Sequence, residues 1–252
     1  MNFNNKNVLI TGASRGIGKA TALAFAEKGA RVGINYKNNT ADAQRTLSQL
    51  LGEGHRLFQK DISKKENCQM LISEFVHHYG QLDVLVNNAG ISIFHEIDSV
   101  AFEHWTHAWE ETFKTNLFAA ANLSFWGAKA MMQTGGGRIV NVSSRGAFRG
   151  EPTKPAYGSS KAALNAMSQS LAKKLAPHNI YVGVVAPGFT ETEMAAETLT
   201  PREKENLLRE SPFQRMAQPE EVAHAILFLA SKGAEYVSGT IIDVNGASYL
   251  RS

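Results

Sequence analysis

Short apolar runs alternate with longer, amphipathic or small-residue-rich segments from one end of this chain to the other. In runs such as Val84-Leu85-Val86 consecutive positions are apolar, which is typical of strands buried on both faces of a sheet. The apolar runs predict strands over Val8–Thr11, Val32–Asn35, Arg56–Gln59, Val84–Asn87, Arg138–Val142, Tyr181–Val185 and Thr240–Val244. The segments between them predict helices over Gly18–Lys28, Ala41–Leu51, Lys64–Tyr79, Phe102–Gln133, Tyr157–Ala176 and Glu220–Ala230.

This regular alternation of strand and helix determines the expected fold class. Successive βαβ units are joined by right-handed crossovers and give a parallel sheet that helices cover on both faces. We therefore predict an α/β fold, a Rossmann-type doubly wound parallel sheet of about seven strands. A chain of 252 residues fits one domain of this type, and it contains no evident linker or repeat, so we expect a single domain over residues 1–252.

One segment, residues 188–212, has no evident place in this sheet. It is rich in Thr and Glu and carries a helix-start signal at Thr200-Pro201. Long connections that follow the carboxyl end of a strand commonly cover functional sites. We expect this segment to be a substrate loop or lid.

Composition and charge argue against several classes of protein. An apolar fraction of 43% with 19% charged residues is ordinary for a globular protein with a sizeable core. The net charge of +3 comes from Lys and Arg residues scattered along the chain, so we expect no nucleic-acid partner. No apolar run approaches the ~20 residues needed to cross a bilayer. Because Met1–Asn7 carries no apolar leader and Cys68 is the only cysteine, we expect a cytoplasmic protein without disulfides or membrane contacts.

The first predicted strand runs into a glycine-rich turn that opens a helix, with the spacing G-x-x-x-G-x-G from Gly12 to Gly18. This spacing differs from the usual G-x-G-x-x-G fingerprint, but the same physics applies. Gly12 would allow the tight turn, Gly16 would let a pyrophosphate approach backbone N–H groups, and Gly18 would let the helix pack closely. The turn therefore predicts a dinucleotide site at the N-terminus of the first helix.

The residues that follow the second, third and fourth predicted strands indicate which cofactor is bound. A carboxylate at the end of the second strand would bind the ribose 2′-OH of NAD(H), but none occurs before Asp42. Arg15 and Lys37 would both reach a 2′-phosphate, so we prefer NADP(H); NAD(H) stays possible, since both cations would also suit a solvated surface. Asp61-Ile62 would meet the adenine or serve as a helix N-cap, and Asn87–Gly90 would meet a ribose. The candidate cofactor-binding residues of these segments are Gly12, Ser14, Arg15, Gly16, Ile17, Gly18, Tyr36, Lys37, Asp61, Ile62, Asn88, Ala89 and Gly90.

The clearest candidate for catalysis is the stretch from Tyr157 to Lys161. Residues at i and i+4 share a helix face, so Lys161 would lie beneath the Tyr157 ring and favour the ionised phenol. A tyrosine whose pKa falls from about 10 toward neutrality exchanges protons with an alcohol or carbonyl oxygen. The spacing alone is common, but here it accompanies the glycine turn and Ser144, which closes an apolar run.

Together these segments resemble the short-chain dehydrogenase/reductase family over nearly the whole chain. The residues that carry the likeness follow the order and spacing of the family: Thr11–Gly18, Asn87–Gly90, Asn116, Ser144, Tyr157, Lys161 and Pro187-Gly188. Within the family, the chain is most similar to the β-ketoacyl-ACP (3-oxoacyl-ACP) reductase branch, through Val185–Thr192, Phe228–Ser231 and Val244–Gly246.

The resemblance implies a role for each matched residue. Tyr157 would be the general acid in carbonyl reduction, Ser144 would hydrogen-bond the reacting oxygen, and Lys161 would lower the tyrosine pKa and hold the nicotinamide ribose. Asn116 would anchor a water that feeds a proton relay. The segment after the sixth strand would meet the nicotinamide carboxamide through Pro187, Gly188, Thr190 and Thr192. The implied protein is an NADP(H)-dependent oxidoreductase acting on CH–OH groups, a homotetramer (or dimer) built through Phe102–Gln133 and Tyr157–Ala176.

Other functions stay open. Gly135 and His178 stand where we align the carrier-gripping arginines of the ACP-reductase branch, so recognition of acyl carrier protein is undecided. Arg145 or Arg149 would instead bind a small polar or anionic carbonyl substrate, unless both are solvated. An NAD-dependent dehydrogenase of a sugar, polyol or steroid alcohol, and a non-catalytic dinucleotide sensor, are the remaining alternatives. We expect no metal site, although His104, His107 and Glu111 share one helix face.

Overall fold

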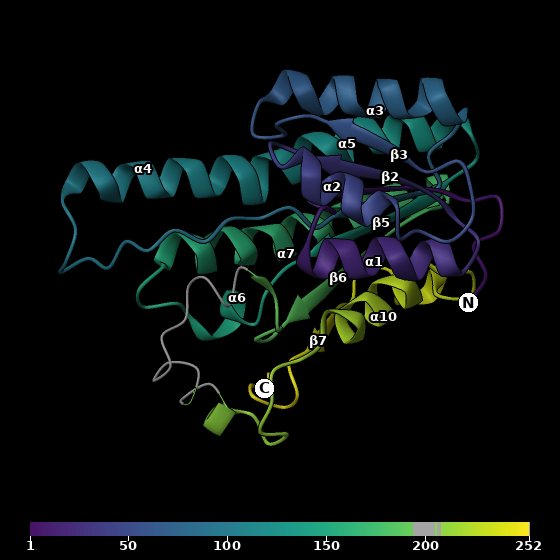
Figure 1. Ribbon diagram of the computed structural model, residues 1–252. Coiled ribbons are helices and arrows are strands. Elements are labelled where there is room, and N and C mark those ends of the chain that lie inside the picture. Colours follow the sequence, from purple (N-terminus) through teal and green to yellow (C-terminus); the bar gives the residue numbers. More distant parts are fainter. Residues whose placement is uncertain (194–204, 206–207, 252) are drawn as a thin grey trace.

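The structure is a computed structural model that describes residues 1–193, 205 and 208–251 (Figure 1). Its centre is a seven-stranded parallel sheet, as predicted, and the strands lie in the order β3-β2-β1-β4-β5-β6-β7. The strands are β1 (Asn7–Thr11), β2 (Arg31–Tyr36), β3 (Arg56–Gln59), β4 (Val84–Asn87), β5 (Gly137–Val142), β6 (Ile180–Pro187) and β7 (Ile241–Val244).

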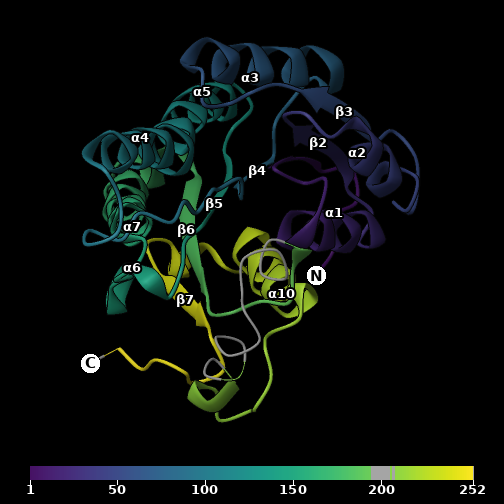
Figure 2. The same ribbon diagram turned by 60° about the vertical axis from the view of Figure 1, so that its left-hand side comes forward.

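Helices cover both faces of this sheet (Figure 2). They are α1 (Gly16–Glu27), α2 (Thr40–Leu47), α3 (Lys65–Tyr79), α4 (Phe102–Phe113), α5 (Ala119–Gln133), α6 (Gly146–Arg149), α7 (Pro155–Leu175) and α10 (Pro219–Ala230). The hydrophobic core on one face joins α1 and α10 to the sheet, and the core on the other joins α3, α5 and α7. Short 3₁₀ turns follow at Ala176–His178 and Glu235–Val237.

The alternation of side chains along a strand explains the continuous apolar runs. Val84 and Val86 pack into the core beneath α1 and α10, whereas Leu85 between them packs into the core beneath α3 and α5. In β1, Ile10 packs into the same core as Val84 and Val86, whereas Leu9 packs into the same core as Leu85. Both faces of each strand are therefore buried, and removal of each such side chain from water contributes about 1.5–3 kcal/mol.

Three elements differ from the sequence-based prediction. The helix predicted as Phe102–Gln133 is interrupted by a π-helical segment, η1 (Lys114–Phe118), between α4 and α5. The second helix ends at Leu47 rather than Leu51, since the chain turns at Ser48 and passes through a left-handed glycine, Gly52. The short helix α6 was not predicted, because its four residues are too few to show a period.

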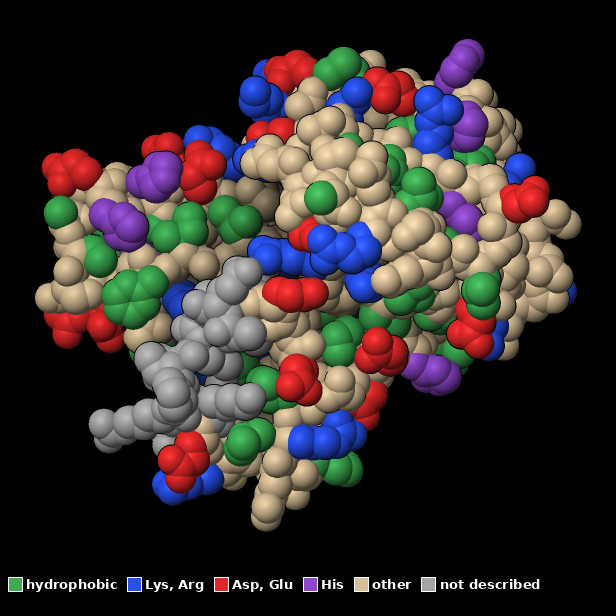
Figure 3. All heavy atoms as spheres, viewed as in Figure 1, with side chains coloured by type: hydrophobic (Ala, Val, Ile, Leu, Met, Phe, Trp, Pro, Cys, Tyr) green, Lys and Arg blue, Asp and Glu red, His purple; other side chains and the backbone are tan. Residues whose placement is uncertain are grey.

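The predicted lid, residues 188–212, is described only in part. It starts after β6, where Thr190 forms an isolated β-bridge with Ala217, and it is helical again at residues 208–210. The helix start predicted at Thr200-Pro201 lies outside the described residues. Among the residues that are described, no helix combines the length and apolarity that a membrane span requires. Basic and acidic side chains are interspersed on the face shown in Figure 3.

Candidate active site

The candidate residues gather at the carboxyl ends of β1, β4, β5 and β6. The strand order reverses between β1 and β4, and in open parallel sheets ligands bind at such a switch point. β1 leads into the glycine turn, β4 into Asn88–Gly90, and β5 into Ser144. Residues far apart in the sequence therefore meet at one edge of the sheet.

The glycine turn has the geometry that its sequence predicts. Gly12 and Gly16 adopt positive φ angles of +62° and +56°, a conformation that side chains other than glycine rarely adopt. A Cβ on Gly12 would lie 3.0 Å from the Ala89 Cα, and a Cβ on Gly18 would collide with the Gly12 carbonyl oxygen. The turn thus packs too closely against α1 and β4 to hold larger residues at these positions.

Asn88 ties β4 to this turn. Its Nδ2 donates to the carbonyl oxygens of Thr11 at 2.9 Å and Gly12 at 3.1 Å, while the Thr11 hydroxyl accepts from the N–H groups of Asn88 at 3.0 Å and Ala89 at 3.1 Å. Asn87 points into the interior and donates to Asn141 at 2.8 Å. Both amides therefore hold the sheet edge together, and a ribose would meet the backbone of Ala89 and Gly90 rather than the Asn88 Nδ2.

Lys37 follows the end of β2 and forms an ion pair with Asp61. Lys37 Nζ lies 3.0 Å from Asp61 Oδ2. Burial raises the pKa of Asp61, but hydrogen bonds from Ser63 and Lys37 outweigh it and hold that pKa below its ordinary value. The N-cap of the following helix is Lys64, so the alternative of Asp61 as N-cap is wrong; its side chain instead closes a turn onto Ser63. Tyr36 and Ile62 are buried beside this pair, and Arg15 stands exposed at the start of α1.

Ser144, Tyr157 and Lys161 come together as predicted. Ser144 follows β5, and its Oγ accepts from the Gly146 N–H at 3.0 Å. Tyr157 is in the first turn of α7, and its side chain is hydrogen-bonded to Ser144. Lys161 lies one turn further along, 4% exposed, and its Nζ donates to the Val142 carbonyl oxygen at 2.8 Å. A phenol, a hydroxyl and an ammonium group thus line one corner of the sheet edge.

The electrostatics of this triplet differ from the sequence-based expectation. Burial raises the pKa of Tyr157 above its ordinary value, and the hydrogen bond with Ser144 offsets only part of this effect. Burial lowers the pKa of Lys161 to about 8. The Lys161 Nζ lies 5.9 Å from the Tyr157 ring centroid and is bound to Val142 instead. In the ligand-free chain, the predicted depression of the tyrosine pKa is therefore absent.

Asn116 lies within the π-helical segment η1, a kind of irregularity that is frequent at functional sites. Its amide clamps the backbone of Ile91, donating to the carbonyl oxygen at 3.0 Å and accepting from the N–H at 2.8 Å. It also donates to Ser160 at 3.2 Å, and Ser160 donates to the Tyr157 carbonyl oxygen at 2.8 Å. A Cβ on Gly90 would lie 3.3 Å from Asn116 Oδ1 and 3.4 Å from Lys161 Nζ, so both polar groups flank Gly90.

The segment after β6 reaches the glycine turn. Gly188 packs so closely on Asn245 that a Cβ would lie 2.9 Å from the Asn245 Cα. Thr190 is buried and donates to the Gly188 carbonyl oxygen at 3.4 Å, and the Thr192 methyl would lie 3.3 Å from a Cβ on Gly16. Pro187 ends β6. Of these residues, Thr192 lies next to the start of α1.

Arg145 is buried and Arg149 half-buried, and both are paired with carboxylates. Arg145 is 3% exposed; it donates to Ser248 Oγ at 2.6 Å and to Glu210 at 3.0 Å. Arg149 donates to the same Glu210 oxygen at 2.9 Å, and both guanidinium groups lie over the Phe189 ring. The idea that one of them binds an anionic substrate is therefore not supported, because their charges are already paired. No pattern in the sequence indicates this pairing, since Glu210 and Ser248 are distant along the chain from both arginines.

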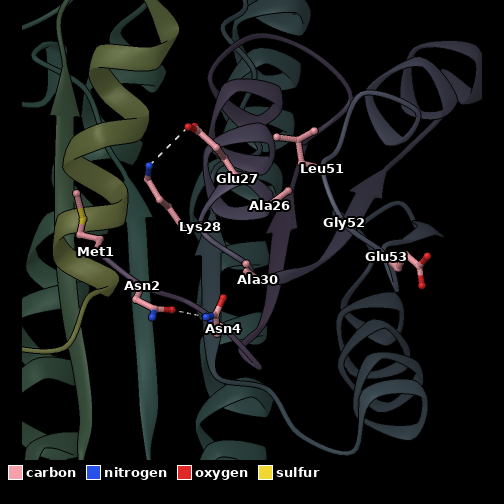
Figure 4. Close-up of a pocket in the computed structure, with 11 residues that line it drawn as sticks. Met1, Asn2, Asn4, Ala26, Glu27, Lys28, Ala30, Leu51, Gly52 and Glu53 are labelled. Atoms are coloured by element: carbon pink, nitrogen blue, oxygen red, sulfur yellow. Dashed lines mark hydrogen bonds and ion pairs between the residues drawn. The ribbon is translucent and has the colours of Figure 1, made fainter.

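A groove of about 390 Å³ lies elsewhere, at the amino ends of β1, β2 and β3 (Figure 4). Lys28 is paired there with Glu27 at 3.6 Å, and the Asn4 N–H donates to Asn2 Oδ1 at 2.8 Å. None of the candidate residues lines it. The chemistry is therefore expected at the opposite edge of the sheet. Among the described residues, no cluster of His, Cys, Asp and Glu has the spacing to hold a metal ion.

Comparison with known proteins shows what the chain resembles. Residues 12–247 match a family model described as enoyl-(acyl carrier protein) reductase. The 3-oxoacyl-[acyl-carrier-protein] reductase FabG of Chlamydia trachomatis is 36% identical over 96% of both chains. The FabG proteins of Staphylococcus aureus and Haemophilus influenzae are 34% and 36% identical over 97% of this chain and 98% of theirs. A putative short-chain alcohol dehydrogenase from Sinorhizobium meliloti superposes with a TM-score of 0.90 at 30% identity, covering 98% of this chain and 97% of its own.

Proposed function

The chain belongs to the short-chain dehydrogenase/reductase family, and we propose that it is an NADP(H)-dependent reductase of 3-oxoacyl thioesters. It is an oxidoreductase that acts on carbonyl or CH–OH groups with a nicotinamide dinucleotide. The observation that carries the proposal is the hydrogen-bonded pair Ser144–Tyr157 with Lys161 one helical turn away, beside the switch point of the sheet. A non-catalytic sensor would have no use for this arrangement.

The residues at the sheet edge fit a dinucleotide. Gly12 and Gly16 have left-handed conformations, and Arg15 is the N-cap residue of α1. A pyrophosphate is well suited to the N–H groups of such a turn, where the helix dipole also favours negative charge. Ala89, Gly90, Pro187 and Thr192 would hold the remainder of the cofactor.

The preference for NADP(H) rests on the end of β2. The Asn35 amide is engaged with the carbonyl oxygens of Phe58 and Lys60, both at 3.1 Å, so it does not serve a ribose hydroxyl. Lys37 is 57% exposed at its side chain and close to the same edge. A 2′-phosphate would compete with Asp61 for this ammonium group, and Arg15 would add a second cation.

Three side chains share the proposed chemistry. A nicotinamide dinucleotide held at the glycine turn would supply the hydride for the carbonyl carbon. Tyr157 donates the proton to the carbonyl oxygen, and Ser144 hydrogen-bonds that oxygen while negative charge develops on it. Lys161 carries a positive charge at neutral pH, because its lowered pKa of about 8 still lies above 7. That charge stabilises the Tyr157 phenolate that remains after proton transfer. Asn116 fixes the neighbouring loop by its two hydrogen bonds to the Ile91 backbone.

Carrier recognition and assembly complete the proposal. Gly135 adopts a φ of +88°, a backbone conformation that residues with a side chain rarely adopt. The backbone at this position therefore disfavours an arginine that would bind the carrier. We therefore take the acyl thioester, and not the carrier surface, as the recognised group. Phe118 and Phe125 are 53% and 55% exposed on η1 and α5, which supports a homotetramer or dimer through these helices.

A substrate screen tests this function. The purified chain is incubated with NADPH and, in parallel, with 3-oxoacyl thioesters of acyl carrier protein and of coenzyme A, with small ketones and with sugars. NADPH oxidation is the readout. We expect the thioesters to give the highest kcat/KM and the carrier to change it little. Higher kcat/KM for a sugar, polyol or steroid would contradict the proposal.

A further inference from the structure

His95 is a buried residue near the candidate active site, and the proposed reaction assigns it no role. It lies in the loop after β4 and is 0% exposed. Its Nδ1 is 2.8 Å from the Ile93 carbonyl oxygen, and its Nε2 is 3.0 Å from the Ala156 backbone nitrogen. A carbonyl oxygen only accepts and a backbone N–H only donates, so Nδ1 carries the hydrogen and Nε2 the lone pair. These two contacts define one tautomer of the ring.

The start of α7 depends on this ring. The N-cap residue Lys154 makes no side-chain capping hydrogen bond, and the first helical residue, Pro155, has no N–H group. The first N–H of the helix is therefore that of Ala156, which is fully buried and out of reach of water. His95 supplies its acceptor from a distant part of the chain. A buried backbone donor without a partner would be costly.

The ring is also fixed from two other sides. The backbone N–H of His95 donates to the carbonyl oxygen of Thr153 at 3.0 Å, and Thr153 lies in the connection between α6 and α7. Trp105 and Trp109 of α4 meet the imidazole edge to face, with ring centroids 5.3 Å and 6.4 Å away. α4 lies alongside α7 in both ribbon views (Figures 1 and 2). His95 thus fastens α4, the loop after β4 and the first turn of α7 to one another.

We propose that His95 is a positioning residue for Tyr157, an inference that rests on the proposed function. Tyr157 directly follows Ala156, so any shift of the first turn of α7 moves the phenol. Its partner Ser144 is held separately, by the N–H of Gly146, the first residue of α6. Loss of the His95 cap would therefore displace Tyr157 relative to Ser144 without touching the glycine turn. The proton donor would be misplaced, while the dinucleotide site would stay intact.

The test compares His95→Phe, His95→Gln and a control, His104→Phe. Phenylalanine keeps the ring volume but offers no acceptor, whereas the Oε1 of glutamine would accept near the position of Nε2. His104 Nε2 donates to the carbonyl oxygen of Phe94, in the same loop as His95, at 2.8 Å, and not to α7. His95→Leu replaces His95→Phe if that variant does not fold. Measured are kcat, KM, the Kd for NADPH and amide hydrogen exchange of residues 156–158.

We expect His95→Phe to lower kcat by about tenfold or more, as small misplacements of reacting groups do. The Kd for NADPH should stay at the wild-type value. His95→Gln should recover most of the loss, His104→Phe should behave as wild type, and exchange at residues 156–158 should rise in His95→Phe alone. Unchanged kcat and exchange in His95→Phe, or an equal loss in both His95 variants, would overturn the inference. A wild-type chain that reduces no carbonyl would refute the proposed function by itself, and the exchange comparison would still decide whether His95 holds α7.

Discussion

Substitution of Lys37 by alanine should weaken binding of NADPH and leave binding of NADH unchanged. The Lys37 side chain is more than half exposed at the end of β2 and forms one ion pair, with Asp61 at 3.0 Å. In the proposed complex this ammonium group binds the 2′-phosphate, which NADH lacks. The variant therefore removes a contact that distinguishes the two cofactors.

The size of the effect follows from two opposing contributions. A hydrogen bond between charged groups stabilises a complex by about 1.5–3 kcal/mol. Against this, Lys37 must leave Asp61, and exposed ion pairs are worth about 0.2–1 kcal/mol. The net loss in Lys37→Ala is about 1–2 kcal/mol, or roughly 5- to 30-fold in the Kd for NADPH. Asp61→Asn should act in the opposite direction and tighten NADPH binding by up to about fivefold, since it frees Lys37.

Fluorescence titration of the reduced nicotinamide at low salt measures both dissociation constants. Lys60→Ala is the matched control, because Lys60 is also paired with a single carboxylate, that of Glu74 at 2.7 Å, at the end of the neighbouring strand. We expect this control to bind both cofactors as wild type does. If Lys37→Ala weakens NADPH and NADH equally, or neither, Lys37 does not bind a 2′-phosphate and the reasoning on cofactor preference is refuted.

Three further predictions concern stability. Gly18→Ala should lower the free energy of unfolding in urea by about 1–3 kcal/mol, because the added Cβ meets the Gly12 carbonyl oxygen; wild-type stability would contradict the packing described. Asn116→Ala should lower it by a similar ~1–3 kcal/mol by leaving the Ile91 backbone groups unpaired, and Asn116→Asp, which keeps one acceptor, should lose less. The pKa of Lys161 is about 8 in the folded chain, against an ordinary value of 10.5, so between these pH values the unfolded chain binds more protons and stability rises with pH. Relative to Lys161→Met, the wild type should gain up to about 3 kcal/mol of unfolding free energy over this window; a difference that does not change with pH would refute the burial of this ammonium group.

The architecture could be predicted because it follows from local patterns. Continuous apolar runs such as Val84–Val86 indicate strands covered on both faces, and the structure buries them between two cores. The glycine turn could also be predicted, since Gly12, Gly16 and Gly18 each occur where the backbone of a larger residue would be strained or its side chain would collide with a neighbour. Sequence spacing also predicted that Tyr157 and Lys161 share a helix face.

What could not be predicted depends on partners distant in the sequence or on backbone atoms. The π-helical turn at Asn116 accompanies its clamp on Ile91, and no residue pattern signals such a contact. Lys161 donates to a carbonyl oxygen, so its orientation could not be inferred from spacing to Tyr157. His95 caps α7 through the Ala156 N–H, and its main-chain partners leave no mark in the sequence.

The central claim is that the Tyr157 hydroxyl donates the proton during carbonyl reduction, and Tyr157→Phe tests it most directly. The substitution removes one oxygen atom and keeps the ring. The measurement is kcat with saturating NADPH and the preferred substrate of the screen, together with the Kd for NADPH. We predict a fall in kcat of at least about 10²-fold with a Kd near the wild-type value. Full activity in this variant would contradict the account.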